Sequence, residues 1–214
     1  MEQEHALKIL RTVKEKGPKR NFKQSVDLVI NLKDIDLKKT DQQLDLYVTL
    51  HHSFGKGIRV CGLVGPELVD EAKAHCHHVI KQDEFSKLTP KDIKTLAKEY
   101  DYFVAQANVM PQVAATFGRI LGPRGKMPNP KAGCVVPPKT NLEPLVKRLG
   151  QTVRVLAKKD PVLHLKVGVE DQDEEQIADN IAFLYKQIVL NLPLEDNNVK
   201  NAFLKLTMGS PEAL

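Results

Sequence analysis

One stretch of the chain, residues 118–133, gathers positive charge on a backbone that is poor in regular structure. It reads Gly-Arg-Ile-Leu-Gly-Pro-Arg-Gly-Lys-Met-Pro-Asn-Pro-Lys-Ala-Gly and contains no acidic residue. Because glycine and proline interrupt helices and interior strands, most of it is predicted to be a shaped loop. Cations on such a loop can contact phosphate groups, and a solvated surface loop is the alternative. The basic residues are Arg119, Arg124, Lys126 and Lys131.

A second cluster, at residues 75–78, has the residue types of a metal site. His75, Cys76, His77 and His78 are consecutive, so their side chains point in different directions, and no Cys-x-x-Cys pair accompanies them. A histidine-rich helix end is the preferred interpretation. We therefore predict no metal.

The turn from Gly62 to Gly65 is the strongest sign of an enzyme, because it lies between a predicted strand and a predicted helix, where main-chain amides can meet a phosphate. However, the three-glycine dinucleotide fingerprint is missing, and no lysine follows as in a phosphate loop. The serines and cysteines lie in no recognisable nucleophile motif. We predict no cofactor and no catalysis. A nucleotide-dependent enzyme stays as the alternative, and a protein-binding module docking through the basic loop is a third hypothesis.

Polar side chains facing outward on three predicted strands have the composition of an RNA-binding face. They mix cations with small hydrogen-bonding groups, as contacts to phosphates and 2′-hydroxyl groups require, and a solvated sheet face is the alternative. Aromatic residues make up only 5% of the chain and tryptophan is absent, which argues against base stacking. The outward residues are Lys23, Ser25, Asp27, His164, Lys166, Asn201, Lys205 and Thr207.

The overall composition favours a folded protein that meets polyanions. The formal net charge is +5 and the pI about 9.0. No apolar run could cross a bilayer and the acidic start, Met-Glu-Gln-Glu-His, is no secretory signal, so we expect cytoplasmic residence without membrane contact. The three cysteines are widely spaced, which predicts free thiols in a reducing compartment.

Two kinds of hydrophobic periodicity position these residues. Near both ends of the chain, amphipathic helices accompany strands of alternating polarity, and the first two strands in succession predict an antiparallel pair. In the middle, near-continuous apolar strands alternate with helices, as in a parallel sheet covered on both faces. The strands are predicted at 22–32, 44–50, 58–64, 78–80, 102–105, 152–156, 161–168 and 199–207, and the helices at 2–16, 65–75, 90–99, 111–120, 141–149 and 171–189.

This change of pattern predicts two domains of mixed class, α+β and α/β. Residues 1–56 and 151–214 form a discontinuous α+β domain with an open antiparallel sheet, and residues 57–150 form an inserted three-layer α/β domain that is Rossmann-like. The chain crosses between them near residues 56–58 and 149–152. Two adjacent crossings are expected to act as a hinge.

The order of residues in the basic loop resembles a family signature. Arg-Ile-Leu-Gly-Pro-Arg-Gly-Lys-Met-Pro-Asn-Pro, residues 119–130, closely resembles that of the large-subunit ribosomal protein L-one family in its archaeal form, and the resemblance covers essentially the whole chain. It implies the same two-domain layout and a non-catalytic role. That role is binding of the mobile stalk of large-subunit rRNA near the tRNA exit site, release of deacylated tRNA from that site, and repression of translation through the protein's own mRNA.

The resemblance also implies contact residues. Thr207-Met208-Gly209 matches an rRNA-contacting triplet of the family, and Phe22 and Ser25 match further contact positions. Strict alternation would place Phe22 on the core side unless the strand begins after it. We expect a monomer away from the ribosome and secondary RNA or tRNA contacts from the basic loop. The expected RNA-binding residues are Phe22, Lys23, Ser25, Asp27, His164, Lys166, Gly168, Asn201, Lys205, Thr207, Met208 and Gly209.

Overall fold

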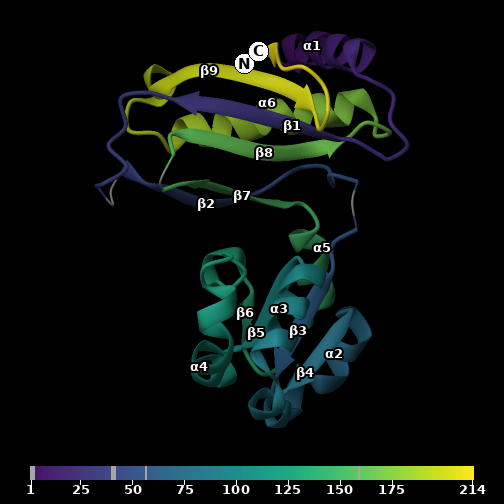
Figure 1. Ribbon diagram of the computed structural model, residues 1–214, viewed down its shortest axis with the longest axis vertical. Coiled ribbons are helices and arrows are strands. Elements are labelled where there is room, and N and C mark those ends of the chain that lie inside the picture. Colours follow the sequence, from purple (N-terminus) through teal and green to yellow (C-terminus); the bar gives the residue numbers. More distant parts are fainter. Residues whose placement is uncertain (1–2, 40–41, 56, 159) are drawn as a thin grey trace. The chain divides into compact units, whose positions relative to one another are not determined.

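The computed structural model describes residues 3–39, 42–55, 57–158 and 160–214. The chain divides into two compact units, one made of residues 1–56 and 151–214 and the other of residues 57–150 (Figure 1). Antiparallel strands in the first unit and parallel strands in the second confirm the predicted mixed fold class.

The first unit is built around a four-stranded antiparallel sheet in the order β10-β9-β1-β8. Alternate residues of β1 are buried, so one face of the sheet packs into the core while the other is partly exposed. The bounds of the unit's elements are α1 (Gln3–Lys16), β1 (Ser25–Leu32), β2 (Leu44–Thr49), β7 (Thr152–Ala157), β8 (Val162–Val169), α6 (Glu174–Leu190), a 3₁₀ turn (Glu195–Asn198), β9 (Val199–Leu206) and β10 (Glu212–Ala213).

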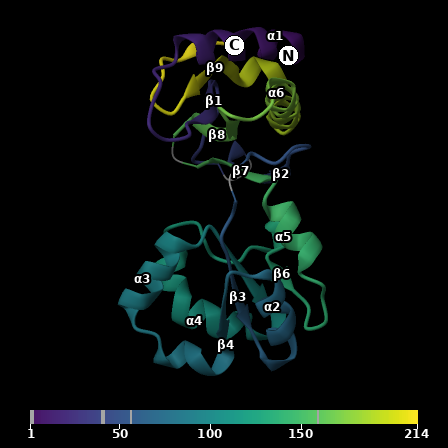
Figure 2. The same ribbon diagram turned by 90° about the vertical axis from the view of Figure 1, so that its right-hand side faces the viewer.

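Helices α1 and α6 supply the other half of this core (Figure 2). In α1 the buried residues Ala6, Leu10 and Val13 recur at three- and four-residue spacing and make one apolar stripe. Asp173 is the N-cap of α6, and its carboxylate accepts a hydrogen bond from the Glu175 amide at 3.3 Å. The helix that closes the core is therefore fixed at its N-terminus, next to the end of β8.

The predicted pairing of the first two strands is wrong. β1 lies between β8 and β9, whereas β2 pairs with β7 in a separate two-stranded sheet. Alternating polarity specifies which face of a strand is buried but does not choose its neighbour. Here Thr49 pairs with Thr152, and the Leu50 amide donates to the Gln151 carbonyl at 2.8 Å. The segment before residues 57–150 thus pairs with the segment after them, as β2 with β7.

The second unit is a parallel sheet in the order β4-β3-β5-β6, with α3 and α4 on one face and α2 and α5 on the other (Figure 2). β3 is buried throughout, as expected of a strand covered on both faces. Its elements are β3 (Val60–Val64), α2 (Val69–His75), β4 (His78–Lys81), α3 (Pro90–Glu99), β5 (Tyr102–Gln106), α4 (Met110–Leu121), β6 (Val135–Val136) and α5 (Glu143–Leu149), with 3₁₀ turns at Pro66–Leu68, Gln82–Lys87, Ala107–Val109 and Pro130–Ala132.

The basic loop is shorter than residues 118–133, because α4 continues through Gly118 to Leu121. A single glycine inside a helix costs only about 1 kcal/mol, and the apolar face of α4 outweighs it. Beyond Gly122, the backbone adopts positive φ at Gly125 (67°) and Gly133 (74°). Side-chain-bearing residues rarely adopt this conformation, so both glycines shape the loop.

Candidate nucleic-acid interface

The triplet Thr207-Met208-Gly209 forms a tight turn directly after β9, called here the 207–209 turn. The Gly209 amide donates to the Leu206 carbonyl at 3.0 Å and closes the turn. As a result, the Met208 side chain points away from the core and is 56% exposed. An exposed methionine at a fixed position is an adaptable apolar contact for a partner.

The 207–209 turn is tied to the start of β1. The Thr207 amide donates to the Ser25 carbonyl at 3.1 Å, and the Ser25 amide donates to Thr207 Oγ1 at 3.0 Å. The two hydroxyl oxygens also lie 3.0 Å apart. Adjacent to this pair, the Met208 amide donates to Gln24 Oε1 at 3.2 Å.

A hollow of about 440 Å³ lies beside this tie and is called here the contact hollow. It joins residues from the start of β1, from β8, from the 207–209 turn and from the segment after β2, which are far apart in the sequence. Phe22 is 50% exposed because β1 begins only at Ser25, so strand alternation does not reach it. The hollow thus combines an exposed ring, cations and hydroxyl groups. Its lining residues are Phe22, Lys23, Ser25, Gly55, Lys166, Val169 and Thr207.

The charges around the contact hollow are interleaved. Asp27 on β1 pairs with Lys205 of β9 on one side and with Lys166 of β8 on the other. Burial raises the pKa of Asp27, while the two lysines act in the opposite direction. A hydrogen bond to Asp171, with a nitrogen–oxygen distance of 2.8 Å, raises the pKa of Lys23. The surface is therefore basic but contains an acid at its centre.

Not every residue of the predicted set reaches the contact hollow. His164 is exposed on β8, two residues from Lys166, whereas Gly168 is buried at a bulge of the β1–β8 pairing. A carbon added to Gly168 would lie 2.9 Å from Ile177 Cγ1, so this glycine allows α6 to pack closely on β8.

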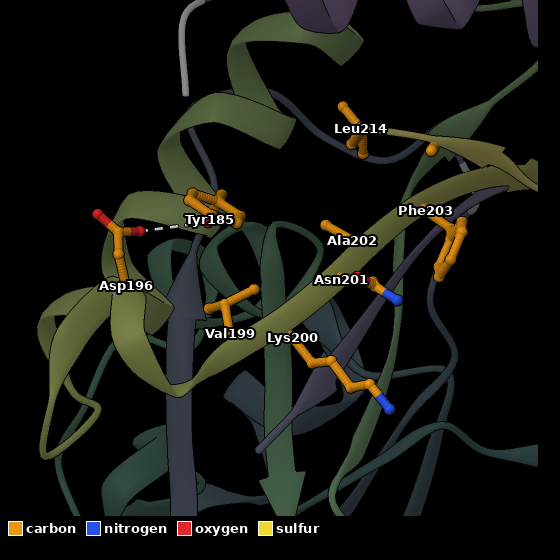
Figure 3. A pocket seen from close by; sticks show the side chains of 9 residues that line it. Tyr185, Asp196, Val199, Lys200, Asn201, Ala202, Phe203 and Leu214 are labelled. Carbon is orange, nitrogen blue, oxygen red and sulfur yellow. Dashed lines mark hydrogen bonds between the residues drawn. The ribbon is translucent and has the colours of Figure 1, made fainter. Parts of the chain in front are cut away.

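Asn201 lies at the opposite end of β9 from Thr207. It lines a second hollow, of about 440 Å³, between β9 and the end of α6 (Figure 3). There the Tyr185 hydroxyl donates to Asp196 Oδ1 at 3.2 Å. Asn201 and the contact hollow are thus separate features of one sheet.

Two cations of the basic loop hold the loop in place. Arg124 donates from Nη1 to the Lys94 carbonyl at 3.1 Å, and Lys126 Nζ donates to the Tyr100 carbonyl at 2.7 Å. The Tyr100 carbonyl follows the C-terminus of α3, where unpaired carbonyls attract cations, whereas the Lys94 carbonyl lies within the helix. Lys131 is exposed, as is Arg119 in the last turn of α4 before the loop. The loop therefore presents some of its charge to solvent and uses the rest for its own packing.

Residues 12–210 match the model of the ribosomal protein L1p/L10e family. The chain belongs to this family. The predicted resemblance is confirmed, and the chain is a ribosomal protein and not an enzyme.

Individual relatives in the L1p/L10e family are archaeal proteins named large ribosomal subunit protein uL1. The one from Thermococcus kodakarensis is 39% identical over 208 residues, which is 94% of each chain. The Methanothermobacter thermautotrophicus protein is 39% identical over 210 residues, 97% of each chain. The Nanoarchaeum equitans protein is 40% identical over 197 residues, 90% of this chain and 92% of the relative.

The turn that suggested a nucleotide-dependent enzyme is already occupied by protein groups. The Gly65 amide donates to Oε1 of the buried Gln106 at 2.9 Å, and Gln106 Nε2 donates to Glu67 Oε2 at 3.4 Å. An amide that is bonded internally, with a carboxylate beside it, is a poor phosphate site. This agrees with the non-enzymatic character of the L1p/L10e family.

The histidines at residues 75–78 serve separate purposes. His75 lies 3.7 Å from Glu71, His77 Nδ1 accepts from the Val60 amide at 3.3 Å, and His78 stacks on Tyr100. Within the described residues, no group of three or more His, Cys, Asp or Glu side chains could hold a metal ion. Among all the residues that the structure describes, no helix is both long and apolar enough to cross a bilayer.

The predicted set missed Gly55 and Val169, which line the contact hollow, and also Gln24 and Glu170, which lie behind it. Gln24 is 1% exposed and bonds both the 207–209 turn and Glu170, the residue after β8. One signal was present: counting in twos from Val26 places Gln24 on the buried side, and a polar residue there needs partners. Glu170 carries no such signal, because it lies in a polar turn.

Proposed function

We propose that this chain binds the mobile stalk of large-subunit rRNA through the contact hollow and the 207–209 turn. The single observation that carries the proposal is the fixed pairing of Ser25 with Thr207, which holds the exposed Met208 next to a hollow lined by Phe22 and two lysines. Folded RNA offers phosphates, 2′-hydroxyl groups and sugar surfaces, and these groups suit such a surface. The relatives named above are proteins of the large ribosomal subunit, which supports an RNA target.

Within this proposal, the residues divide by the contact they make. Lys23, Lys166 and Lys205 attract phosphates, whereas the Ser25 and Thr207 hydroxyls face the sugar groups. Phe22 and Met208 pack on sugar or base surface, and Gly209 lets the RNA backbone come close. Asp27 and His164 lie around this centre, Gly168 lets α6 pack closely on β8, and Asn201 offers a separate contact toward the other end of β9.

The test is a binding titration with a stalk RNA fragment and a scrambled duplex of equal length, across a range of salt concentrations. Wild type is expected to prefer the stalk fragment by about a thousandfold, above a nonspecific electrostatic background. Met208→Ala should lose much of this preference, and Met208→Leu serves as the matched control because it keeps most of the apolar surface. Equal, weak and steeply salt-dependent binding to both RNAs would refute the proposal.

The second part of the proposal concerns movement near the tRNA exit site. Residues 57–150 form an inserted domain, and the paired crossings at 56–58 and 149–152 act as a hinge while Arg119 and Lys131 approach the departing deacylated tRNA. Small-angle scattering with and without stalk RNA tests whether the two domains move apart on binding. One identical compact envelope in both states would contradict the hinge.

The same hollow is proposed to bind a stalk-like structure in the protein's own mRNA and so repress translation. The expectation rests on a shared RNA shape, because a surface poor in aromatic residues reads backbone geometry more than base identity. In competition experiments, a leader fragment of this mRNA should displace stalk RNA, and Met208→Ala should weaken both. A leader fragment that cannot compete at any concentration would exclude this role.

A further inference from the structure

Gln24 is a buried polar side chain whose hydrogen-bonding groups are all occupied. Its main-chain amide donates to Glu170 Oε1 at 3.1 Å, and its carbonyl accepts from the Glu170 amide at 3.0 Å. Its side-chain Nε2 donates to the Pro18 carbonyl at 2.9 Å and to Glu170 Oε2 at 3.3 Å. Oε1 accepts from the Met208 amide at 3.2 Å. Gln24 thus connects three segments of the chain.

The chemistry of the partners fixes the orientation of the Gln24 amide. The Pro18 carbonyl and an ionised Glu170 carboxylate can only accept, and the Met208 amide can only donate. Rotating the side-chain amide by half a turn would place its oxygen against two acceptors and its nitrogen against a donor. Glu170, together with the Pro18 carbonyl, therefore determines which end of Gln24 reaches the 207–209 turn.

The bond from the Met208 amide to Gln24 Oε1 lies just beyond the end of the β1–β9 pairing. The β1–β9 strand register ends at Val26 and Leu206, and the Ser25–Thr207 bonds extend it by one pair. Met208 lies one residue further, where the Gln24 main-chain amide has turned toward Glu170. Because bonded and non-bonded pairs alternate in an antiparallel ladder, β1 offers the Met208 amide no main-chain acceptor, and the Gln24 side chain supplies one.

We propose that Gln24, oriented by Glu170, is the positioning residue that sets the 207–209 turn for RNA recognition. Because it is 1% exposed, Gln24 acts through Met208 and does not touch the RNA. This inference rests on the proposed function, because its main readout is discrimination between stalk and scrambled RNA.

The main test replaces Gln24 by a side chain of the same shape that gains a charge. In Gln24→Glu, two carboxylates meet at neutral pH, the bond to Met208 is disturbed, and affinity for the stalk fragment is expected to fall by about tenfold or more. As the pH falls toward 5, the pair takes up one proton and a hydroxyl donor replaces the lost amide donor. Affinity relative to wild type should then recover.

Other titratable and charged groups lie near this position, and the comparison with wild type at each pH cancels their effects. Lys14, Lys19, Arg20 and Glu170 line the hollow behind Gln24, Lys14 is paired with Glu174, and Asp171 is paired with Lys23. Asp27 and His164 face the RNA side in both proteins.

Two further variants separate positioning from packing. Gln24→Leu keeps the volume but cannot accept from Met208, so its loss of affinity should be similar at every pH. The double variant Q24E/E170Q places an amide opposite the new carboxylate and should bind better than Gln24→Glu at pH 7, without the recovery at low pH. Circular dichroism and the Met208 amide chemical shift, measured without RNA, report whether each variant is folded and whether the turn has moved.

The outcomes distinguish this inference from the proposed function. If wild type does not discriminate stalk RNA, the proposed function fails; if it does, and Gln24→Glu and Gln24→Leu bind within about twofold of it, the positioning role is overturned. Equal losses in both variants that do not change with pH would also overturn it, because they indicate lost packing. Recovery of Gln24→Glu alone at low pH supports it, provided that the Met208 amide of this variant is shifted at neutral pH and returns to the wild-type position at low pH.

Discussion

The hydroxyl groups of Ser25 and Thr207 lie 3.0 Å apart, and the Ser25 amide donates to the same Thr207 oxygen. Thr207→Val keeps the side-chain shape but removes this oxygen, so the Ser25 amide loses a partner at the edge of the contact hollow. We expect a stability loss of about 1 kcal/mol and a fall in stalk RNA affinity of about tenfold. Denaturant unfolding and RNA titration measure the two effects.

Thr207→Ser is the matched control for this prediction, because it keeps the oxygen and removes only a methyl group. It should bind RNA almost as well as wild type. If Thr207→Val binds like wild type while both variants are folded, the hydroxyl pair has no role in recognition.

Asp27 limits how strongly the site attracts any polyanion. Its carboxylate lies between Lys166 and Lys205 and partly neutralises their positive charge. Asp27→Asn removes this negative charge, so both lysines attract phosphates more strongly. We expect tighter binding to the scrambled duplex, a salt dependence steeper by about one counterion, and less discrimination. Asp160→Asn makes the same charge change at an exposed position before β8 and is the control. An unchanged salt slope in Asp27→Asn would contradict the prediction.

The pH dependence of binding follows from the raised pKa of Asp27. Protonation of this carboxyl group removes a negative charge that faces RNA phosphates, so wild-type affinity should rise as the pH falls through that pKa. RNA binding in turn favours the protonated form. Asp27→Asn retains His164 but lacks this titration, so the difference between the two pH profiles isolates Asp27. Parallel profiles would show that Asp27 does not face the RNA.

The alternation of polar and apolar residues along the strands predicted part of the site. It placed Ser25, Lys166 and Thr207 on outward positions correctly, because polar and apolar residues alternate on all three strands. It could not assign strand neighbours, and β1 was wrongly paired with β2. The contact hollow also needs the bulge after Val26 and the late start of β1, which are set by packing of the whole unit. The two-residue strands β6 and β10 are too short to show a period.

The basic loop illustrates a different limit, since composition alone cannot separate packing from binding. Lys126 donates to the Tyr100 carbonyl, whereas Lys131 is exposed on the same segment. Lys126→Met should lower the thermal midpoint by about 2–4 °C, as expected for a loss of about 1 kcal/mol in a chain of this size. Lys131→Met should leave the midpoint unchanged. Equal midpoints for the two variants would mean that the Lys126 bond contributes nothing to stability.

Asp45 on β2 is bonded by two cations of the β7 region. Arg154 reaches both carboxylate oxygens at 3.1 and 3.2 Å, and Lys158 Nζ lies 2.8 Å from Oδ2. Burial acts to raise the pKa of Asp45, but the hydrogen bonds from Lys158 and Arg154 outweigh it and lower the pKa. The resulting stabilisation is present above the unfolded carboxyl pKa of about 3.9 and is lost as the pH falls through the lower folded value.

Asp45→Asn should therefore weaken the two-stranded sheet at pH 7 by about 1–2 kcal/mol, and its difference from wild type should shrink below about pH 4. Protection of the β7 amides against hydrogen exchange, measured at several pH values, follows this local loss. Glu212→Gln is the control, because Glu212 is bonded to the exposed Lys16 at 2.7 Å and lies outside this sheet. A difference between Asp45→Asn and wild type that stays constant from pH 7 to 3 would show that the lost stability comes from packing and not from the ion pairs.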